Sequence, residues 1–132
     1  MIKKVDHISI VVKDLNEGLK TFESILGIKS SDVHEVPDQG IKAAMIKVGA
    51  LEIELIEPTN TESGVAKFLE KKGEGVHHIC FEVDDVDKEL GSLAAQGVEL
   101  IDKQGRKGLA GKIGFLHPKS TRGVLIELAQ KV

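Results

Sequence analysis

The chain has 132 residues and a formal net charge of −3, with 41% hydrophobic and 30% charged residues. This length and composition fit one globular domain that buries a core without disulfide bonds. The charge balance gives no electrostatic footprint for nucleic acid or for an anionic membrane, so we expect neither as a partner.

The cellular compartment is predicted from cysteine usage and from the absence of a targeting pattern. The single cysteine, Cys80, excludes an internal disulfide and fits a reducing environment. Asp6 and His7 interrupt the apolar run at the N-terminus, so we do not interpret it as a signal peptide. No apolar stretch approaches the roughly 18 residues that a membrane span requires. We therefore expect a cytoplasmic location.

The first part of the chain predicts the order βαβββ. A strand pattern opens the chain, Asp14 is placed as a helix N-cap, and Gly27 is placed to end that helix. The expected helix covers residues 15–26, and the expected strands that follow cover residues 29–36, 41–48 and 51–57.

The second part of the chain predicts the same order again. Asp85 is the expected N-cap of a helix over residues 86–96, and Gly97 is expected to end it. The expected strands cover residues 98–102, 112–117 and 124–129. Residues 63–73 predict a helix that links the two parts. The glycine-rich stretch 103–114 predicts a mobile loop, and its spacing matches no phosphate-binding motif.

An internal repeat supports this division. VDHISIVVKDLNEGL (5–19) aligns without a gap on VHHICFEVDDVDKEL (76–90), and GALEIELIEP aligns on RGVLIELAQ. We predict one α+β domain, 1–132, with βαβββ modules at 1–60 and 75–132 and a link at 61–74. The modules are expected to form a curved mixed sheet, with helices on its convex side and a metal site in its cleft.

The period of two in a strand separates the neighbouring histidines. His78 shares a face with Cys80, and the repeat pairs His78 with His7, whereas His77 lies outside this period. The same rule is used for the other strands. We expect Ile8, Ile10, Val12, Ile53, Leu55, Ile79, Phe81, Val83, Val124, Ile126 and Leu128 in the core, and His7, Ser9, Val11, Glu52, Glu54, Ile56, Glu82, Leu125, Glu127 and Ala129 on the other face.

One pair of candidate metal ligands comes from each module: His7 with Glu54, and His78 with Glu127. The repeat selects Glu54 over Glu52 because only Glu54 aligns on a glutamate. Two imidazoles and two carboxylates suit a first-row divalent ion with two open positions, and they argue against Mg²⁺. The ions that fit are Co²⁺, Mn²⁺, Ni²⁺, Fe²⁺ and Zn²⁺. Cys80 lies on the right face for a fifth ligand, but a buried cysteine that fills the core is the simpler interpretation.

The stretches VDHISIVVKDL, HHICFEVDDVD and GFLHPKSTRGVLIEL resemble the vicinal oxygen chelate (glyoxalase-like) superfamily, and in particular its methylmalonyl-CoA epimerase branch. The resemblance covers nearly the whole chain. It implies an acyl-CoA substrate, a divalent metal with Co²⁺ favoured, a homodimer, and the same four ligands that the repeat indicates. The implied reaction interconverts (2R)- and (2S)-methylmalonyl-CoA by α-proton abstraction through an enolate.

The resemblance also implies roles for single residues. Glu127 matches a glutamate proposed as a base as well as a ligand. Many relatives carry a second glutamate after a Gln-Gly pair, where this chain has Ala43. Lys42 is expected to point the other way. Glu52 or a water on the metal are the alternatives for the second base. Lys112, Lys119 and Arg122 are candidates for the phosphates of the substrate, and His117 is a candidate substrate contact.

Three other functions stay open at this point. A lactoylglutathione lyase-like enzyme has a similar site, and the HPK…GVLIEL ending argues against it. An extradiol dioxygenase uses two histidines and one carboxylate, and here a fourth ligand fills an iron position. A metal-free binding module of the resistance type is expected to lack the ligands, and this chain keeps all four.

Overall fold

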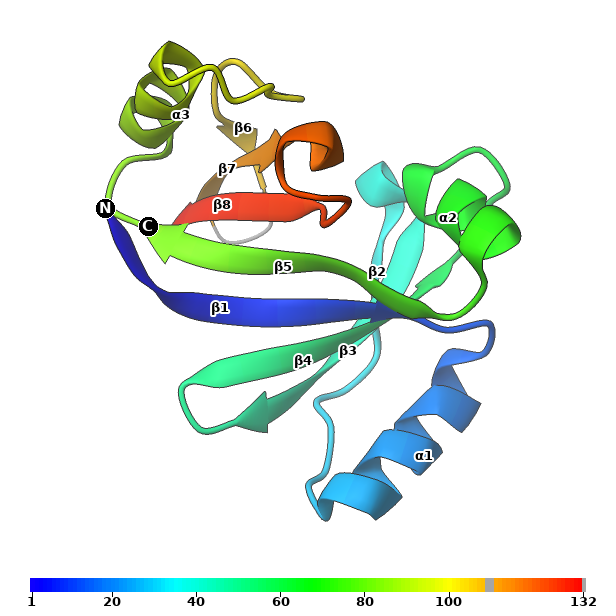
Figure 1. The fold of residues 1–132 in the computed structure, drawn as a ribbon. Helices are drawn as coiled ribbons and strands as arrows, with labels where there is room; N and C mark the ends of the chain where they lie inside the picture. Colours follow the sequence, from blue (N-terminus) through cyan, green and yellow to red (C-terminus); the bar gives the residue numbers. More distant parts are fainter. Residues whose placement is uncertain (109–110, 132) are drawn as a thin grey trace. The chain divides into compact units, whose positions relative to one another are not determined.

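The computed structural model describes residues 1–108 and 111–131 (Figure 1). It divides into two compact units, one formed by His7–His77 and one formed by Met1–Asp6 with His78–Val132. The order βαβββ occurs twice, with one helix between, as predicted. The elements are β1 (Ile2–Val11), α1 (Leu15–Leu26), β2 (His34–Val36), β3 (Ile41–Val48), β4 (Leu51–Pro58), α2 (Gly64–Lys72), β5 (Gly75–Val83), α3 (Val86–Ala95), β6 (Arg106–Lys107), β7 (Gly111–Leu116) and β8 (Ile126–Lys131), with 3-10 turns at Pro37–Gln39 and Pro118–Ser120.

In the unit His7–His77, the strand order is β2-β3-β4-β1, with β4 antiparallel to β3 and parallel to β1. Helix α1 packs beside β3 and β4 (Figure 1). The apolar side chains that it covers form a continuous cluster, as the helical spacing predicted. The buried members are Val12, Leu15, Leu19, Ala44, Ile46 and Leu55.

The opposite face of this sheet is partly covered by α2. Val11 and Ile56 belong to a buried cluster against which Val65, Phe68 and Leu69 of α2 pack. The prediction that the helices cover the convex side and leave this face as an open cleft is therefore wrong at this end of β1 and β4. His7, Ser9 and Glu54 lie on the same face but are not members of this cluster.

In the second unit, the strand order is β5-β8-β7-β6. Strand β8 is parallel to β5 and antiparallel to β7, as β4 is to β1 and β3 in the first unit. Helix α3 covers one face, and the buried cluster there is Val83, Val86, Leu90, Leu116 and Leu128, with Phe81 and Ile126 packed against it. The N-terminal segment joins this unit through ion pairs of Lys3 with Glu82 and Asp84.

The predicted helix boundaries depend on caps that the structure contains. The carboxylates of Asp14 and Asp85 accept hydrogen bonds from the third residue beyond them, at 3.0 Å and 3.1 Å. Gly27 follows α1 at φ 69°, a left-handed conformation that glycine adopts without steric cost. Helix α3 ends at Ala95, one residue earlier than predicted. Among the described residues, no helix is long and apolar enough to cross a membrane.

The strand predicted over 29–36 is wrong for most of its length, since only His34–Val36 is extended and paired. Side-chain hydrogen bonds compete with the ladder here. The Glu23 carboxylate accepts from both the backbone and the hydroxyl of Ser30, and the hydroxyl of Ser31 accepts from Met45 N–H.

Three predictions in the second half also need correction. Residues 98–102 form no strand apart from a single bridge of Leu100 to Leu116. The last strand begins at Ile126 rather than Val124, because Val124 is tied into a turn with Thr121 and is exposed. The stretch 103–114 is not all loop, since it holds β6 and the start of β7; residues 109–110 lie outside the described residues.

Gly111 offers a direct test of the β7–β8 pairing. A Cβ atom at this position would lie 2.0 Å from the carbonyl oxygen of Gln130, so the backbone would have to shift. We expect Gly111→Ala to lower the free energy of unfolding by about 1–3 kcal/mol in urea titrations. Gly91→Ala is the control, because nothing lies within 4 Å of its Cβ and alanine favours the helix by about 0.5–1 kcal/mol. Equal effects of both changes would contradict the pairing.

Candidate functional site

The first candidate pair, His7 and Glu54, lies on neighbouring parallel strands. Ser9 is the register partner of Glu54, and His7 is two residues earlier on the same face. Nε2 of His7 lies 3.7 Å from Oε1 of Glu54, with side chains only 14% and 11% exposed. The fully buried Ser9 hydroxyl donates a hydrogen bond to that same oxygen. Ser9 therefore fixes the carboxylate next to the imidazole.

The second candidate pair, His78 and Glu127, lies on β5 and β8. Cys80 is the register partner of Glu127, and His78 is two residues earlier on the same face. Nε2 of His78 lies 3.0 Å from Oε1 of Glu127, with side chains 9% and 10% exposed. The ring of Phe115 meets the His78 ring edge-on, with centroids 5.6 Å apart. The imidazole is therefore held between a carboxylate and an aromatic ring.

Both pairs fit the donor set of a divalent first-row ion. Ligands about 2.1 Å from a six-coordinate ion lie about 3 Å apart when they are adjacent. The second pair, at 3.0 Å, has this spacing, and the first, at 3.7 Å, approaches it. Each histidine stands two residues before the register partner of its glutamate, so the sequence repeat is also a repeat of geometry.

A family model described as the glyoxalase/bleomycin resistance protein/dioxygenase superfamily matches residues 6–116. The chain belongs to this superfamily. It is 34% identical to the mitochondrial methylmalonyl-CoA epimerase of Homo sapiens, over 96% of this chain and 73% of that protein. It is 35% identical to an ethylmalonyl-CoA/methylmalonyl-CoA epimerase of Cereibacter sphaeroides, over 98% of this chain and 99% of that protein.

A solved structure supports the same fold. The Streptomyces coelicolor methylmalonyl-CoA epimerase in complex with 2-nitronate-propionyl-CoA superposes with a TM-score of 0.91 and 36% identity, over 100% of this chain and 96% of that one. The predicted fold class, an α+β fold of tandem βαβββ modules in the glyoxalase superfamily, is therefore confirmed.

The neighbouring histidine, His77, contacts α2. Its ring packs on Phe68 of α2, with centroids 5.0 Å apart and planes at 71°. The side chain of His77 is therefore part of the packing of α2, whereas that of His78 lies beside Glu127.

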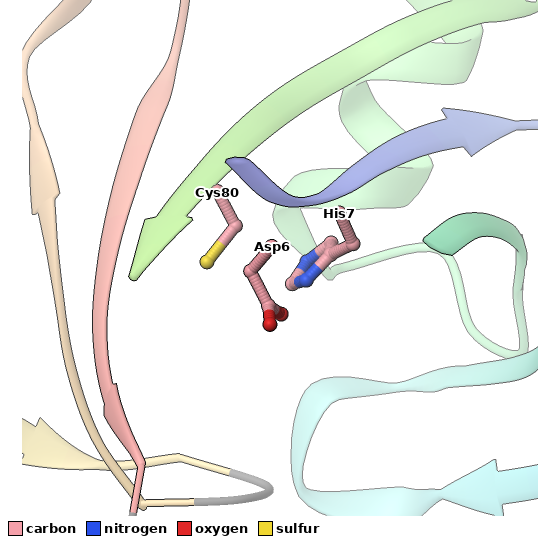
Figure 2. Close-up of side chains that lie close together, drawn as sticks. All are labelled: Asp6, His7 and Cys80. Carbon is pink, nitrogen blue, oxygen red and sulfur yellow. The ribbon is translucent and has the colours of Figure 1, made fainter. Parts of the chain in front are cut away.

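Figure 2 shows Asp6, His7 and Cys80 as sticks. Asp6 and Cys80 belong to the same unit and offer ligand atoms within 4.8 Å of one another. Oδ1 of the buried Asp6 lies 2.6 Å from Nζ of Lys131. Cys80 is fully buried opposite Glu127. The Asp6 carboxylate therefore has a cationic partner, a contact that sequence reasoning missed because no spacing links these two residues.

The position of the second base in many relatives is buried in this chain. Ala43 is fully buried in the cluster beneath α2. Lys42 faces the other way, as expected, with Nζ 3.6 Å from a Glu57 oxygen. Glu52 is the register partner of His7 and therefore lies on the face of the candidate ligands.

The candidate phosphate contact Lys112 is engaged by α3. Its Nζ lies 2.6 Å from Oδ2 of Asp87, on the opposite face of β7 from Phe115. This hydrogen bond raises the pKa of Lys112. The same bond is the main reason that the pKa of the Asp87 carboxyl is lowered, and the hydrogen bond from the Gly105 N–H is the second. This lysine lies away from the face that carries His78 and Glu127.

The other candidate substrate contacts gather at the turn after β7. Nδ1 of His117 accepts the Lys119 N–H at 3.0 Å and caps the 3-10 turn. When Nδ1 accepts the Lys119 N–H, it has no proton to donate to the Glu99 oxygen 3.4 Å away. We therefore assign the hydrogen bond of Nδ1 to the Lys119 N–H. Arg122 has φ 60°, an uncommon conformation for a residue other than glycine. The substrate role of these residues stays a prediction.

Proposed function

We propose that the protein interconverts (2R)- and (2S)-methylmalonyl-CoA, as an isomerase that acts on an acyl-CoA. The observation that carries the proposal is the buried His78–Glu127 pair at 3.0 Å, which the His7–Glu54 pair repeats. The named relatives support the substrate. They do not favour a lactoylglutathione lyase, a dioxygenase or a metal-free binding module.

The proposed ligands are His7, Glu54, His78 and Glu127, and Co²⁺ is the favoured ion before Mn²⁺, Ni²⁺, Zn²⁺ or Fe²⁺. The α-proton of the substrate lies between a thioester and a carboxylate, and its removal places negative charge on the thioester oxygen. A bound divalent ion would supply electrostatic stabilisation of that charge. Ser9 and Phe115 keep the ligating side chains oriented before the substrate arrives.

Glu127 is our proposed base. Its carboxylate is 10% exposed, so few waters compete for the oxygen that accepts the α-proton. Inversion also requires a proton for the opposite face of the planar intermediate, and Ala43 has none to give. Glu52 and a water are the two candidate donors, and of these Glu52 shares the face of His7.

The first test is solvent deuterium exchange at the α-carbon of methylmalonyl-CoA, with metal-loaded and chelator-stripped protein. We expect exchange and loss of stereochemical purity with the metal-loaded protein alone. A fully loaded protein that exchanges no deuterium would overturn the proposed reaction, and glutathione adducts would then be the next substrates to assay.

We expect Ser9→Ala to weaken Co²⁺ binding by about 10- to 100-fold, the usual effect of removing an outer-shell hydrogen bond to a ligand. The physical reason is that the Glu54 oxygen loses the hydroxyl that orients it. The measurement is the dissociation constant from Co²⁺ titration. The hydroxyl of Ser120 accepts the Glu99 N–H, and Glu99 is not a candidate ligand, so Ser120→Ala is the control variant. An unchanged dissociation constant in Ser9→Ala would show that the hydroxyl does not act on the metal.

We further propose that residues 1–132 act as one domain, with modules 1–60 and 75–132 and a link at 61–74. The family model, which matches residues 6–116, supports this. A homodimer and a cytoplasmic location complete the proposal. Cys80 is buried and is in no disulfide, which is compatible with a reducing compartment. Light scattering coupled to gel filtration measures the oligomeric state.

A further inference from the structure

We propose that Arg106 binds the free carboxylate of the substrate and so selects malonyl-type thioesters. This inference rests on the proposed function and extends it to a residue that no sequence pattern marked as a candidate. Arg106 lies in a glycine-rich stretch that sequence analysis interpreted as a loop. In the structure it lies in β6, paired with β7.

The register of three strands places Arg106 on the face of the second candidate pair. Arg106 is opposite Ile113, and Phe115, two residues further along β7, is opposite Glu127. Directly opposed residues and residues two apart share a face of the sheet. Arg106, Phe115, Glu127 and His78 therefore project from the same side of this unit.

Ring contacts connect the guanidinium to the imidazole. The Cζ atom of Arg106 lies 5.5 Å from the centroid of the Phe115 ring, a cation–π contact. The same ring meets His78 edge-on at 5.6 Å. The positive charge is therefore one aromatic ring away from the side chain that pairs with Glu127.

Asp102 fixes the orientation of this arginine. Its Oδ1 accepts the Arg106 Nε–H at 3.1 Å, and its Oδ2 accepts the Phe115 N–H at 2.8 Å. The carboxylate is thus anchored to β7 and accepts the Nε–H of the guanidinium. Within residues 1–108 and 111–131, Asp102 is the carboxylate that pairs with Arg106, and no hydrogen bond engages its two Nη groups. The side chain is 52% exposed. Two parallel N–H donors match a carboxylate.

The structure of the substrate indicates that Arg106 binds its free carboxylate and not its phosphates. The carboxylate is attached directly to the α-carbon, whose proton Glu127 is proposed to remove. The phosphates lie at the far end of the pantetheine arm. While the α-carbon is at Glu127, the Arg106 guanidinium, one ring away from His78, is close to the substrate carboxylate. It is then far from the phosphates.

The test compares Arg106→Gln with Lys107→Gln, measured as the metal-loaded protein. Lys107 is adjacent and loses the same charge, but it is opposite Lys112 on the α3 side of the sheet. Propionyl-CoA, which has the thioester and the phosphates but no free carboxylate, is the competitive inhibitor. For Arg106→Gln we expect kcat/KM for methylmalonyl-CoA to fall about 10- to 100-fold, with the inhibition constant of propionyl-CoA unchanged. We expect Lys107→Gln to change neither, and Arg106→Lys to recover part of the loss.

Two results would overturn the proposal: an unchanged kcat/KM in Arg106→Gln, or equal weakening of methylmalonyl-CoA and propionyl-CoA, which would place the arginine at the phosphates. A wild-type protein without epimerisation would overturn the proposed function instead. Arg106 is then tested by calorimetric binding of the two thioesters. A preference for methylmalonyl-CoA that Arg106→Gln removes supports the proposal, and a preference that it keeps, or no preference in the wild type, refutes it.

Discussion

Replacing Glu127 by glutamine is expected to lower kcat for epimerisation by about 10²- to 10⁴-fold, the range that one general base contributes. Glutamine has nearly the same shape and retains a carbonyl oxygen that can lie beside His78, now 3.0 Å from the Glu127 carboxylate. It cannot accept the α-proton at neutral pH. Metal occupancy is therefore expected to fall much less than turnover, because three other candidate ligands remain.

The two effects are separated by measuring Co²⁺ content and deuterium exchange on the same preparation. Glu70→Gln on α2, an exposed carboxylate outside both candidate pairs, is the matched control. Near-wild-type exchange with Glu127→Gln would exclude Glu127 as the base. Parallel loss of metal and exchange would mean that the carboxylate acts as a ligand alone.

The candidate pairs could be predicted from the sequence because a repeat carries more information than a single residue. A lone strand histidine or glutamate is usually structural or solvated. His78 and Glu127 became candidates because His7 and Glu54 occupy matching places, and the register confirms that each histidine shares a face with its glutamate. The helix limits were also predictable, because Asp14 and Gly27 are local signals.

Contacts that depend on which strands and helices pack together could not be predicted from the sequence. Arg106 was assigned to a loop because glycine neighbours suggest one, yet it pairs with Ile113 and lies over Phe115. The covering of Val11 by α2 was missed for a similar reason, since period two gives the face of a strand but not the helix that packs on it.

His78→Ala and His7→Ala are each expected to weaken Co²⁺ binding by at least about 100-fold. Loss of a residue that only supports a ligand weakens metal binding by up to about 100-fold, and each of these changes removes a proposed ligand itself. His77→Ala is the matched control, since it deletes the same imidazole one residue away from His78. Its ring packs on Phe68 at 5.0 Å, so we expect a loss of about 0.5–1.5 kcal/mol in unfolding free energy with metal affinity nearly unchanged.

The measurements are Co²⁺ titration at fixed pH and urea unfolding of each variant without metal. If the face of the strand decides each role, His78→Ala and His7→Ala lose metal affinity, and His77→Ala loses packing energy. Equal weakening of Co²⁺ binding in all three would contradict this assignment, because His77 and His78 are neighbours that differ only in the direction in which their strand projects them. Loss in His78→Ala with full binding in His7→Ala would show that the repeated geometry of His7 and Glu54 at 3.7 Å does not act as a ligand pair.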